Sequence, residues 1–171
     1  IPEGLKTQEK KIIDYLEEKT DSQILVHGES CFGACDLIKW DVYSDIDIDA
    51  FVQIGHTSIP DFEKQKTPYF FVNAESKIDA TESLKKTLKH LEDKTVGLCT
   101  TAQHLHEIDK IKNFLEENNI KTVIEKGDSR IKHPGQILGC NFSSAKKIEE
   151  KIDVYLYIGS GVFHPLGLIL S

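Results

Sequence analysis

Residues 49–55 read Asp-Ala-Phe-Val-Gln-Ile-Gly, and residues 153–159 read Asp-Val-Tyr-Leu-Tyr-Ile-Gly. Each stretch is a short apolar run between an aspartate and a glycine, which predicts a buried strand that ends in a loop. The same correspondence holds upstream, where Leu16 precedes Gly28 by 12 positions and Leu115 precedes Gly127 by 12. The chain therefore carries one pattern twice, and such a duplication sets the architecture before any single motif does.

Each copy holds one cysteine in a matching loop. Cys35 follows Gly33 and Ala34, and Cys140 follows Gly139. A free cysteine is most often a small buried hydrophobe, and that interpretation applies to either residue taken alone. Their matched positions favour instead two thiols that converge on one site. Thiolates bind zinc or an iron–sulfur cluster, and two are too few for either, so a third ligand is expected from elsewhere in the chain, from another subunit or from further sequence.

The two other cysteines have no counterpart in the repeat. Cys31 lies four positions before Cys35 and is expected to be a packing residue, with a zinc-binding pair as the alternative. Cys99 ends an apolar run and is predicted to lie in the core. Four cysteines without a visible signal peptide indicate the reducing cytoplasm.

The composition is that of a soluble globular protein, with 39% hydrophobic and 29% charged residues. The net charge of −7 argues against nonspecific binding to nucleic acid or to an anionic membrane. No apolar run approaches the roughly 18–20 residues that span a bilayer. The chain has no methionine and stops within the apolar residues 166–170, from which we expect a piece of a longer protein.

Short apolar strands alternate with amphipathic helices along the chain. The expected strands are 23–27, 49–54, 69–73, 95–99, 122–125 and 154–158, and the expected helices are 6–19, 81–92, 105–118 and 143–151. This alternation predicts an α/β fold of two similar repeats, residues 1–82 and 83–171, each a small parallel sheet covered by helices.

Ligands of such sheets bind beyond the carboxyl ends of the strands. The loops that follow the strands are therefore expected to gather Cys35, His56, His104, Asp128, Arg130, Cys140 and His164 at one edge.

Three of these loops allow two interpretations each. Residues 100–104 can hold an anion with free backbone N–H groups, or a threonine can simply cap the following helix. Arg130 can grip a carboxylate or pair with Asp128. His164 is a candidate base or part of a turn, and Gly159-Ser160-Gly161 would allow a ligand close to the backbone.

Taken together and in order, the loops resemble those of the archaeal diphthamide synthases. The resemblance rests on Gly33-Ala34-Cys35-Asp36, Gly55-His56-Thr57, Thr100-Thr101-Ala102-Gln103-His104, Gly127-Asp128-Ser129-Arg130, residues 134–141 and residues 158–167. Each motif alone is weak, but the set covers nearly the whole chain.

The resemblance implies three similar α/β domains that each give one cysteine to a [4Fe-4S] cluster. The open iron takes S-adenosylmethionine, whose 3-amino-3-carboxypropyl group is transferred by radical chemistry to a histidine of translation elongation factor 2. The family works as a homodimer and needs an electron donor. Carried over, Cys35 and Cys140 are the first two cluster ligands.

The loops at the expected sheet edge supply candidate substrate-binding residues, and the resemblance indicates what the chain lacks. The candidates for binding S-adenosylmethionine are Gly55, His56, Gln103, His104, Asp128, Arg130, Gly159, Ser160 and His164. The third repeat and its cysteine are missing, so we expect this piece to be inactive alone.

Two other functions are compatible with the residues. A cluster-dependent lyase such as quinolinate synthase also has three related domains with one cysteine each, and it uses the open iron as a Lewis acid. A two-domain binding protein without a redox site predicts cysteines that are buried apart.

Overall fold

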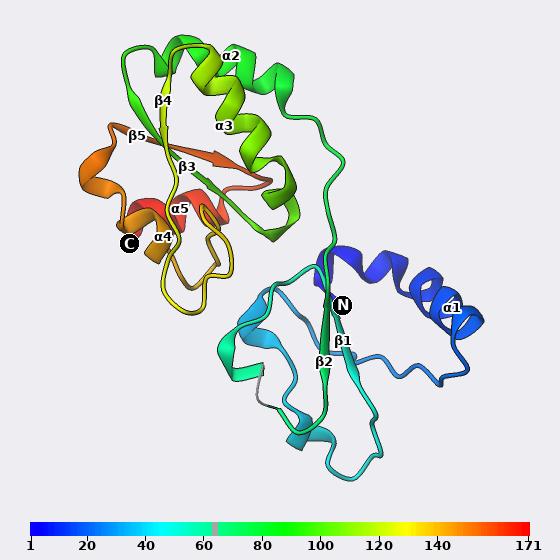
Figure 1. Ribbon diagram of the computed structural model, residues 1–171. Coiled ribbons are helices and arrows are strands. Elements are labelled where there is room, and N and C mark those ends of the chain that lie inside the picture. Colours follow the sequence, from blue (N-terminus) through cyan, green and yellow to red (C-terminus); the bar gives the residue numbers. More distant parts are fainter. Residues whose placement is uncertain (63–64) are drawn as a thin grey trace.

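The computed structural model describes residues 1–62 and 65–171 and confirms the predicted α/β fold. Figure 1 shows two units joined by an extended segment over residues 73–80. The N-terminal unit precedes this segment and the C-terminal unit, residues 81–171, follows it. Each unit is built on a small sheet whose strands are all parallel.

The sheet of the C-terminal unit has three strands in the order β4-β3-β5. Strand β3 (Thr95–Thr100) lies between β4 (Lys121–Val123) and β5 (Val154–Ile158). Helices α2 (Thr81–Leu91) and α3 (Ile108–Glu117) cover one face, and α4 (Ser143–Lys146) and α5 (Phe163–Leu170) cover the other. The unit is thus a sheet between two helical layers.

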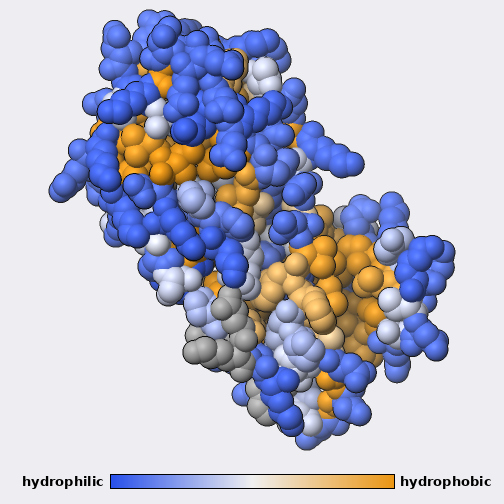
Figure 2. All heavy atoms as spheres, viewed as in Figure 1, coloured by the Kyte–Doolittle hydropathy of each residue, from blue (hydrophilic) through white to orange (hydrophobic). Residues whose placement is uncertain are grey.

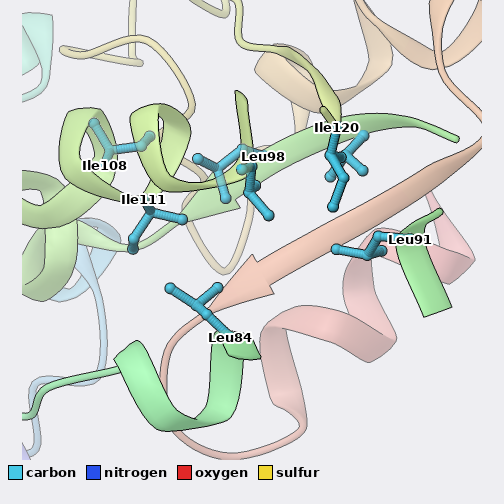
Figure 3. Packing of buried hydrophobic residues seen from close by; sticks show 8 residues of the cluster. Leu84, Leu91, Leu98, Ile108, Ile111 and Ile120 are labelled. Carbon is cyan, nitrogen blue, oxygen red and sulfur yellow. The ribbon is translucent and has the colours of Figure 1, made fainter. Parts of the chain in front are cut away.

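The core of this unit lies between the sheet and helices α2 and α3. Figure 3 shows Leu84 and Leu91 of α2, Ile108 and Ile111 of α3, and Leu98 of β3 in one cluster of buried side chains. Full burial of each such side chain contributes about 1.5–3 kcal/mol. This core holds β3 in place, and β3 carries the loop that begins at Thr101.

The N-terminal unit is less complete. Its sheet pairs β1 (Phe51–Ile54) with β2 (Tyr69–Val72), and one face packs on a small core of Cys31, Leu37, Ile59 and Phe62. On the other face Val52, Phe70 and Val72 are exposed, and Figure 2 shows apolar atoms at the surface of this unit. Helix α1 (Glu9–Lys19) follows a 3₁₀ turn, Glu3–Gln8, and buries none of its residues.

One predicted strand is wrong. Residues 23–27 form no strand with any part of the chain that the structure describes. A strand exists only through hydrogen bonds to a neighbour, and β4, the counterpart of residues 23–27, pairs with β3. Among the residues that the structure describes, residues 23–27 have no comparable central strand beside them.

The predicted helices differ from the observed ones toward the C-terminus. The last helix expected from the sequence ends at residue 151, and His164 and Pro165 are expected in a loop or turn, yet both lie in α5, whose nearly continuous apolar run has no amphipathic stripe. Proline is tolerated in the first turn of a helix, where its missing N–H is not needed. A 3₁₀ turn, Ala102–Glu107, precedes α3, and α4 is followed by another, Glu149–Lys151.

Two further points concern the organisation of the chain. The division predicted between residues 82 and 83 lies in the first turn of α2, whose Leu84 belongs to the C-terminal core. Along residues 1–62 and 65–171, the helices fall short of the length and hydrophobicity that crossing a bilayer requires.

Candidate functional site

The two matched cysteines meet between the units. Cys35 Sγ and Cys140 Sγ lie 2.8 Å apart, although the residues are separated by 105 positions. Both are free cysteines and both are exposed. Two soft donors side by side at the surface are what a thiolate-bound metal or cluster requires of its protein ligands.

Cys35 lies in a 3₁₀ turn, Ala34–Asp36, that its own loop holds closed. The backbone N–H of Asp36 donates to Gly33 O over 3.0 Å. Asp36 Oδ2 accepts hydrogen bonds from the backbone N–H groups of Phe32 (2.8 Å) and Gly33 (3.0 Å). The side chain next to the thiol thus fixes the path of the chain around it.

Cys140 lies in a tight turn between Leu138 and Asn141. The backbone N–H of each of these two residues donates to the carbonyl of the other, over 2.9 and 3.2 Å. Asn141 Nδ2 donates to both carboxylate oxygens of Asp128 (2.9 and 3.0 Å), and Asn141 Oδ1 accepts from Ser143 N (2.9 Å). The turn that presents Cys140 is therefore anchored to the Gly127–Arg130 loop.

The thiol of Cys35 keeps its proton near neutral pH. The hydrogen bond with Cys140 raises the pKa of Cys35 to about 11, and partial burial acts in the same direction, while the charge of Arg130 opposes it. A metal or cluster binds thiolates, so binding must release protons from this pair. Among the described residues no three His, Cys, Asp or Glu side chains converge, and the pair would supply two ligands of a larger set.

Polar contacts between the units hold the cysteine loops together. Gln136 Nε2, fully buried, donates to Thr57 Oγ1 over 2.7 Å. Gln103 Nε2 donates to Gly55 O over 3.3 Å, and Gln103 O accepts from Ser76 N over 2.9 Å. Gly55 has φ +78, which favours glycine there. Gly55 and Gln103, two of the predicted substrate contacts, thus link the units.

His56 lies behind the Cys35 loop. Its Nδ1 is 2.8 Å from Gln53 Nε2 and 3.8 Å from Cys31 Sγ. Burial lowers the pKa of His56, whereas a hydrogen bond to the backbone of Phe32 acts in the opposite direction and is the weaker effect. Cys31 is buried in the small core, as expected. Cys99 is fully buried as well, and burial raises its pKa to about 12.

Asp128 and Arg130 lie in the loop anchored to the turn of Cys140. Arg130 Nη2 is 3.7 Å from Asp128 Oδ2, and both side chains are about half exposed. Asp128 Oδ1 also accepts from Arg130 N over 2.9 Å, and this bond and those from Asn141 lower the pKa of Asp128. Asp128 organises its loop, and the charge of Arg130 is near enough to act on Cys35.

The other predicted contacts belong to the C-terminal unit. His164 is half-buried in α5 and stacks on Tyr157, with ring centroids 5.9 Å apart. Burial lowers the pKa of His104 and of His164. Gly159 and Ser160 are exposed in the loop after β5.

Neither Thr100, the last residue of β3, nor Thr101 caps the following turn. The hydroxyl of Thr100 donates to Ile158 O of β5 over 2.8 Å, and Thr101, at the N-cap, makes no side-chain cap hydrogen bond. The simple capping interpretation of this loop is therefore wrong.

Four residues that hold the site together were not among the predicted site residues. They are Asp36, Thr57, Gln136 and Asn141. The repeat contained a signal for two of them, because an Asp or Asn directly follows each matched cysteine. Short polar side chains of this type commonly bond to nearby backbone groups and close turns.

Comparison with known proteins gives a consistent result. The family model described as "Putative diphthamide synthesis protein" matches residues 1–171. The chain is 37% identical over 174 residues to the 2-(3-amino-3-carboxypropyl)histidine synthase of Pyrococcus horikoshii, covering 99% of this chain and 48% of that protein. For the enzyme of the same name from Methanocaldococcus jannaschii, the identity is 30%, with 96% of this chain and 44% of that protein covered.

A solved structure agrees with these matches. The crystal structure of Dph2 from Pyrococcus horikoshii with a 4Fe-4S cluster superimposes with a TM-score of 0.83 at 37% identity, covering 99% of this chain and 49% of that one. The chain thus spans about half the length of the archaeal relatives that it matches.

Proposed function

The chain belongs to the diphthamide synthesis protein family, and from this premise we propose that it forms two of the three domains of a 3-amino-3-carboxypropyl transferase. In this proposal Cys35 and Cys140 are two of the three protein ligands of a [4Fe-4S] cluster. S-adenosylmethionine is the donor, and a histidine of translation elongation factor 2 is the acceptor. The observation that carries the proposal is the 2.8 Å contact between thiols from two copies of one repeat.

When bound and reduced, the cluster would supply the electron that breaks a carbon–sulfur bond of S-adenosylmethionine and releases the 3-amino-3-carboxypropyl group. The chain's own residues have other tasks. Cys35 and Cys140 give up their protons and hold the cluster at the junction of the units. Arg130, whose charge acts on Cys35 and whose guanidinium is about half exposed, is the candidate that binds the methionyl carboxylate.

The proposal also covers the third domain, the oligomeric state and the electron donor of the enzyme. The third ligand would come from a third α/β repeat, so this chain by itself should hold a cluster weakly and be inactive. A homodimer in the cytoplasm, with a separate electron donor, completes the proposal. A binding protein without a redox site predicts cysteines that are buried apart, and here they touch and are exposed.

Anaerobic iron–sulfur reconstitution of the full-length protein tests the ligand assignment. Cys35→Ala and Cys140→Ala should each abolish the visible absorbance of the cluster and lower the bound iron. Cys31→Ala should leave both unchanged, because that thiol is buried in the small core of the N-terminal unit. An unchanged cluster in the Cys35 and Cys140 variants would show that the ligands lie elsewhere.

A second measurement separates this reaction from a Lewis-acid lyase. The reduced full-length protein should cleave S-adenosylmethionine and transfer the 3-amino-3-carboxypropyl group to elongation factor 2, detected as a mass increase on one histidine. Arg130→Lys keeps the charge but loses the bidentate geometry, so it should raise the KM for S-adenosylmethionine more than it lowers kcat. Failure to cleave S-adenosylmethionine would exclude the proposed reaction.

A further inference from the structure

The residue that directly follows each matched cysteine is a short polar one, Asp36 after Cys35 and Asn141 after Cys140. In both places the side chain folds back on its own loop. Asp36 Oδ2 accepts from two backbone N–H groups, those of Phe32 and Gly33, which lie just before the thiol. These bonds close the chain around Cys35.

Asn141 closes its turn differently. Its side chain donates to Asp128 and accepts from Ser143 N, and only 5% of the residue is exposed. Leu138 and Asn141 pair through their backbones, so that Gly139 and Cys140 form the tip of the turn. The amide thereby ties the turn of Cys140 to the neighbouring loop.

The two side chains are not interchangeable, because their partners differ. Asp36 contacts only donors here, so the oxygen of either a carboxylate or an amide satisfies them. Asn141 must donate to a carboxylate and accept from an N–H at once, which an amide can do and a carboxylate cannot. An aspartate at position 141, which is buried, would face the carboxylate of Asp128, and two like charges in contact are unfavourable.

We propose that Asp36 and Asn141 are positioning residues that hold the thiols of Cys35 and Cys140 together at the junction of the two units. The assignment of this thiol pair to a cluster rests on the proposed function. The positioning itself belongs to the cluster-free chain and can be measured there. Asp128 takes part as the partner of Asn141.

The measurement is the rate at which the two thiols of the cluster-free chain form a disulfide with oxidised glutathione. Two thiols lose two protons and two electrons, and one glutathione disulfide is reduced to two glutathione thiols. Cleavage by a protease and mass spectrometry then show which cysteines are joined. One thiolate first attacks glutathione disulfide, which gives a mixed disulfide and one glutathione thiolate, and the other cysteine thiolate then displaces the second glutathione. The rate of this second step reports the effective concentration of one cysteine at the other.

The variants separate charge from geometry. Asp36→Ala and Asn141→Asp should each slow formation of the Cys35–Cys140 disulfide about tenfold, because each loses hydrogen bonds in which one partner is charged. Asp36→Asn should keep the wild-type rate within about threefold, because the amide oxygen still accepts. The matched control Asp45→Asn removes a charge from an exposed residue of the same unit and should not change the rate.

The decisive variant exchanges the two partners. Asn141→Asp combined with Asp128→Asn restores one donor facing one carboxylate, and the amide oxygen introduced by the second substitution would still accept from Arg130 N. The double variant should recover the wild-type rate within about threefold, which a nonspecific loss of structure would not permit. Thermal unfolding of each variant is followed in parallel. Disulfide formation in Asn141→Asp should be slower than in the wild type even at temperatures where both chains are still folded.

The results that would overturn the positioning role differ from those that would overturn the proposed function. Wild-type rates in Asp36→Ala and Asn141→Asp, or no recovery in the exchanged variant, would overturn the positioning role. If reconstitution shows no cluster on these cysteines while the rates follow the predicted order, the proposed function fails and the positioning role stands.

Discussion

Strand β5 and strand β1 occupy the same place in the two copies of the repeat, yet only one is covered on both faces. In β5, Leu156 and Ile158 pack against the core beneath α2 and α3, while Tyr155 and Tyr157 pack on the opposite side. In β1, the counterpart of Leu156 is Val52, which is 47% exposed. The difference lies in the neighbours, because β5 pairs with the central strand β3 and β1 pairs with β2 alone.

This comparison shows that the two thiols are held by supports of unequal strength. The turn that holds Cys140 is supported by the buried residues Gln136 and Asn141, and its unit has the larger hydrophobic core. The Cys35 turn is closed by an exposed aspartate and rests on a core of four buried residues. We therefore expect the N-terminal unit to open first, since local stability follows the amount of buried apolar contact.

The largest effect should come from the core of the C-terminal unit. Leu98→Ala removes a side chain with 0% exposure and should lower the free energy of unfolding by about 4 kcal/mol, whereas Leu37→Ala, at 7% exposure in the small core, should cost about 2 kcal/mol. Denaturant unfolding gives both values, and hydrogen exchange assigns them to a unit. Leu25→Ala, at a residue 60% exposed, is the control and should change stability by less than about 0.5 kcal/mol.

One result would contradict the expected difference between the two units. Equal costs for Leu98→Ala and Leu37→Ala, with exchange rising evenly over both units, would show that the chain unfolds as one body and that the comparison is wrong.

Two glycines at matching places in the repeat, Gly127 and Gly28, test the same comparison with a smaller expected effect on stability. A Cβ on Gly127 would lie 2.4 Å from Ser143 Oγ and 2.8 Å from Ser144 N, whereas a Cβ on its counterpart Gly28 would meet nothing within 4 Å. Gly127→Ala should therefore cost about 2 kcal/mol through overpacking. Gly28→Ala should be neutral or slightly stabilising, because it restricts the unfolded chain. Thermal unfolding compares the two, and a similar loss for both would mean that the Gly28 loop is also packed.

Much of this arrangement could be predicted from the sequence because it depends on local periodicity and on the repeat. Strands β1, β2, β3 and β5 are short apolar runs, β1 and β5 each lie between an aspartate and a glycine, and α2 and α3 carry a clear apolar stripe. The meeting of Cys35 and Cys140 is expected from their matched places in the repeat, and it occurs although the strand expected before Cys35 does not form and the two residues lie in separate units.

Other features depend on partners that a single sequence does not show. Residues 23–27 have the composition of a strand, but pairing decides whether a strand forms. Gln103 was predicted to bind substrate, yet its amide donates to Gly55 O across the junction of the units. The choice between an amide that binds a ligand and one that joins two loops is made by tertiary contacts, which leave no trace in local spacing.

The smallest expected effect is the pH dependence of the N-terminal unit. Burial lowers the pKa of His56 below its ordinary value of 6.5, so the unfolded chain binds a proton at a pH where the folded unit does not. Stability therefore falls as the pH drops through 6.5 and stops falling below the folded pKa. His56→Gln should flatten this slope in hydrogen exchange of the N-terminal unit, whereas the exposed His133→Gln should not. Burial also lowers the pKa of His164, but that residue lies in the C-terminal unit, which has the larger core. Acid should therefore raise exchange around β1 and the Cys35 turn before it does so around β5, and the reverse order would mean that the C-terminal unit is the weaker support.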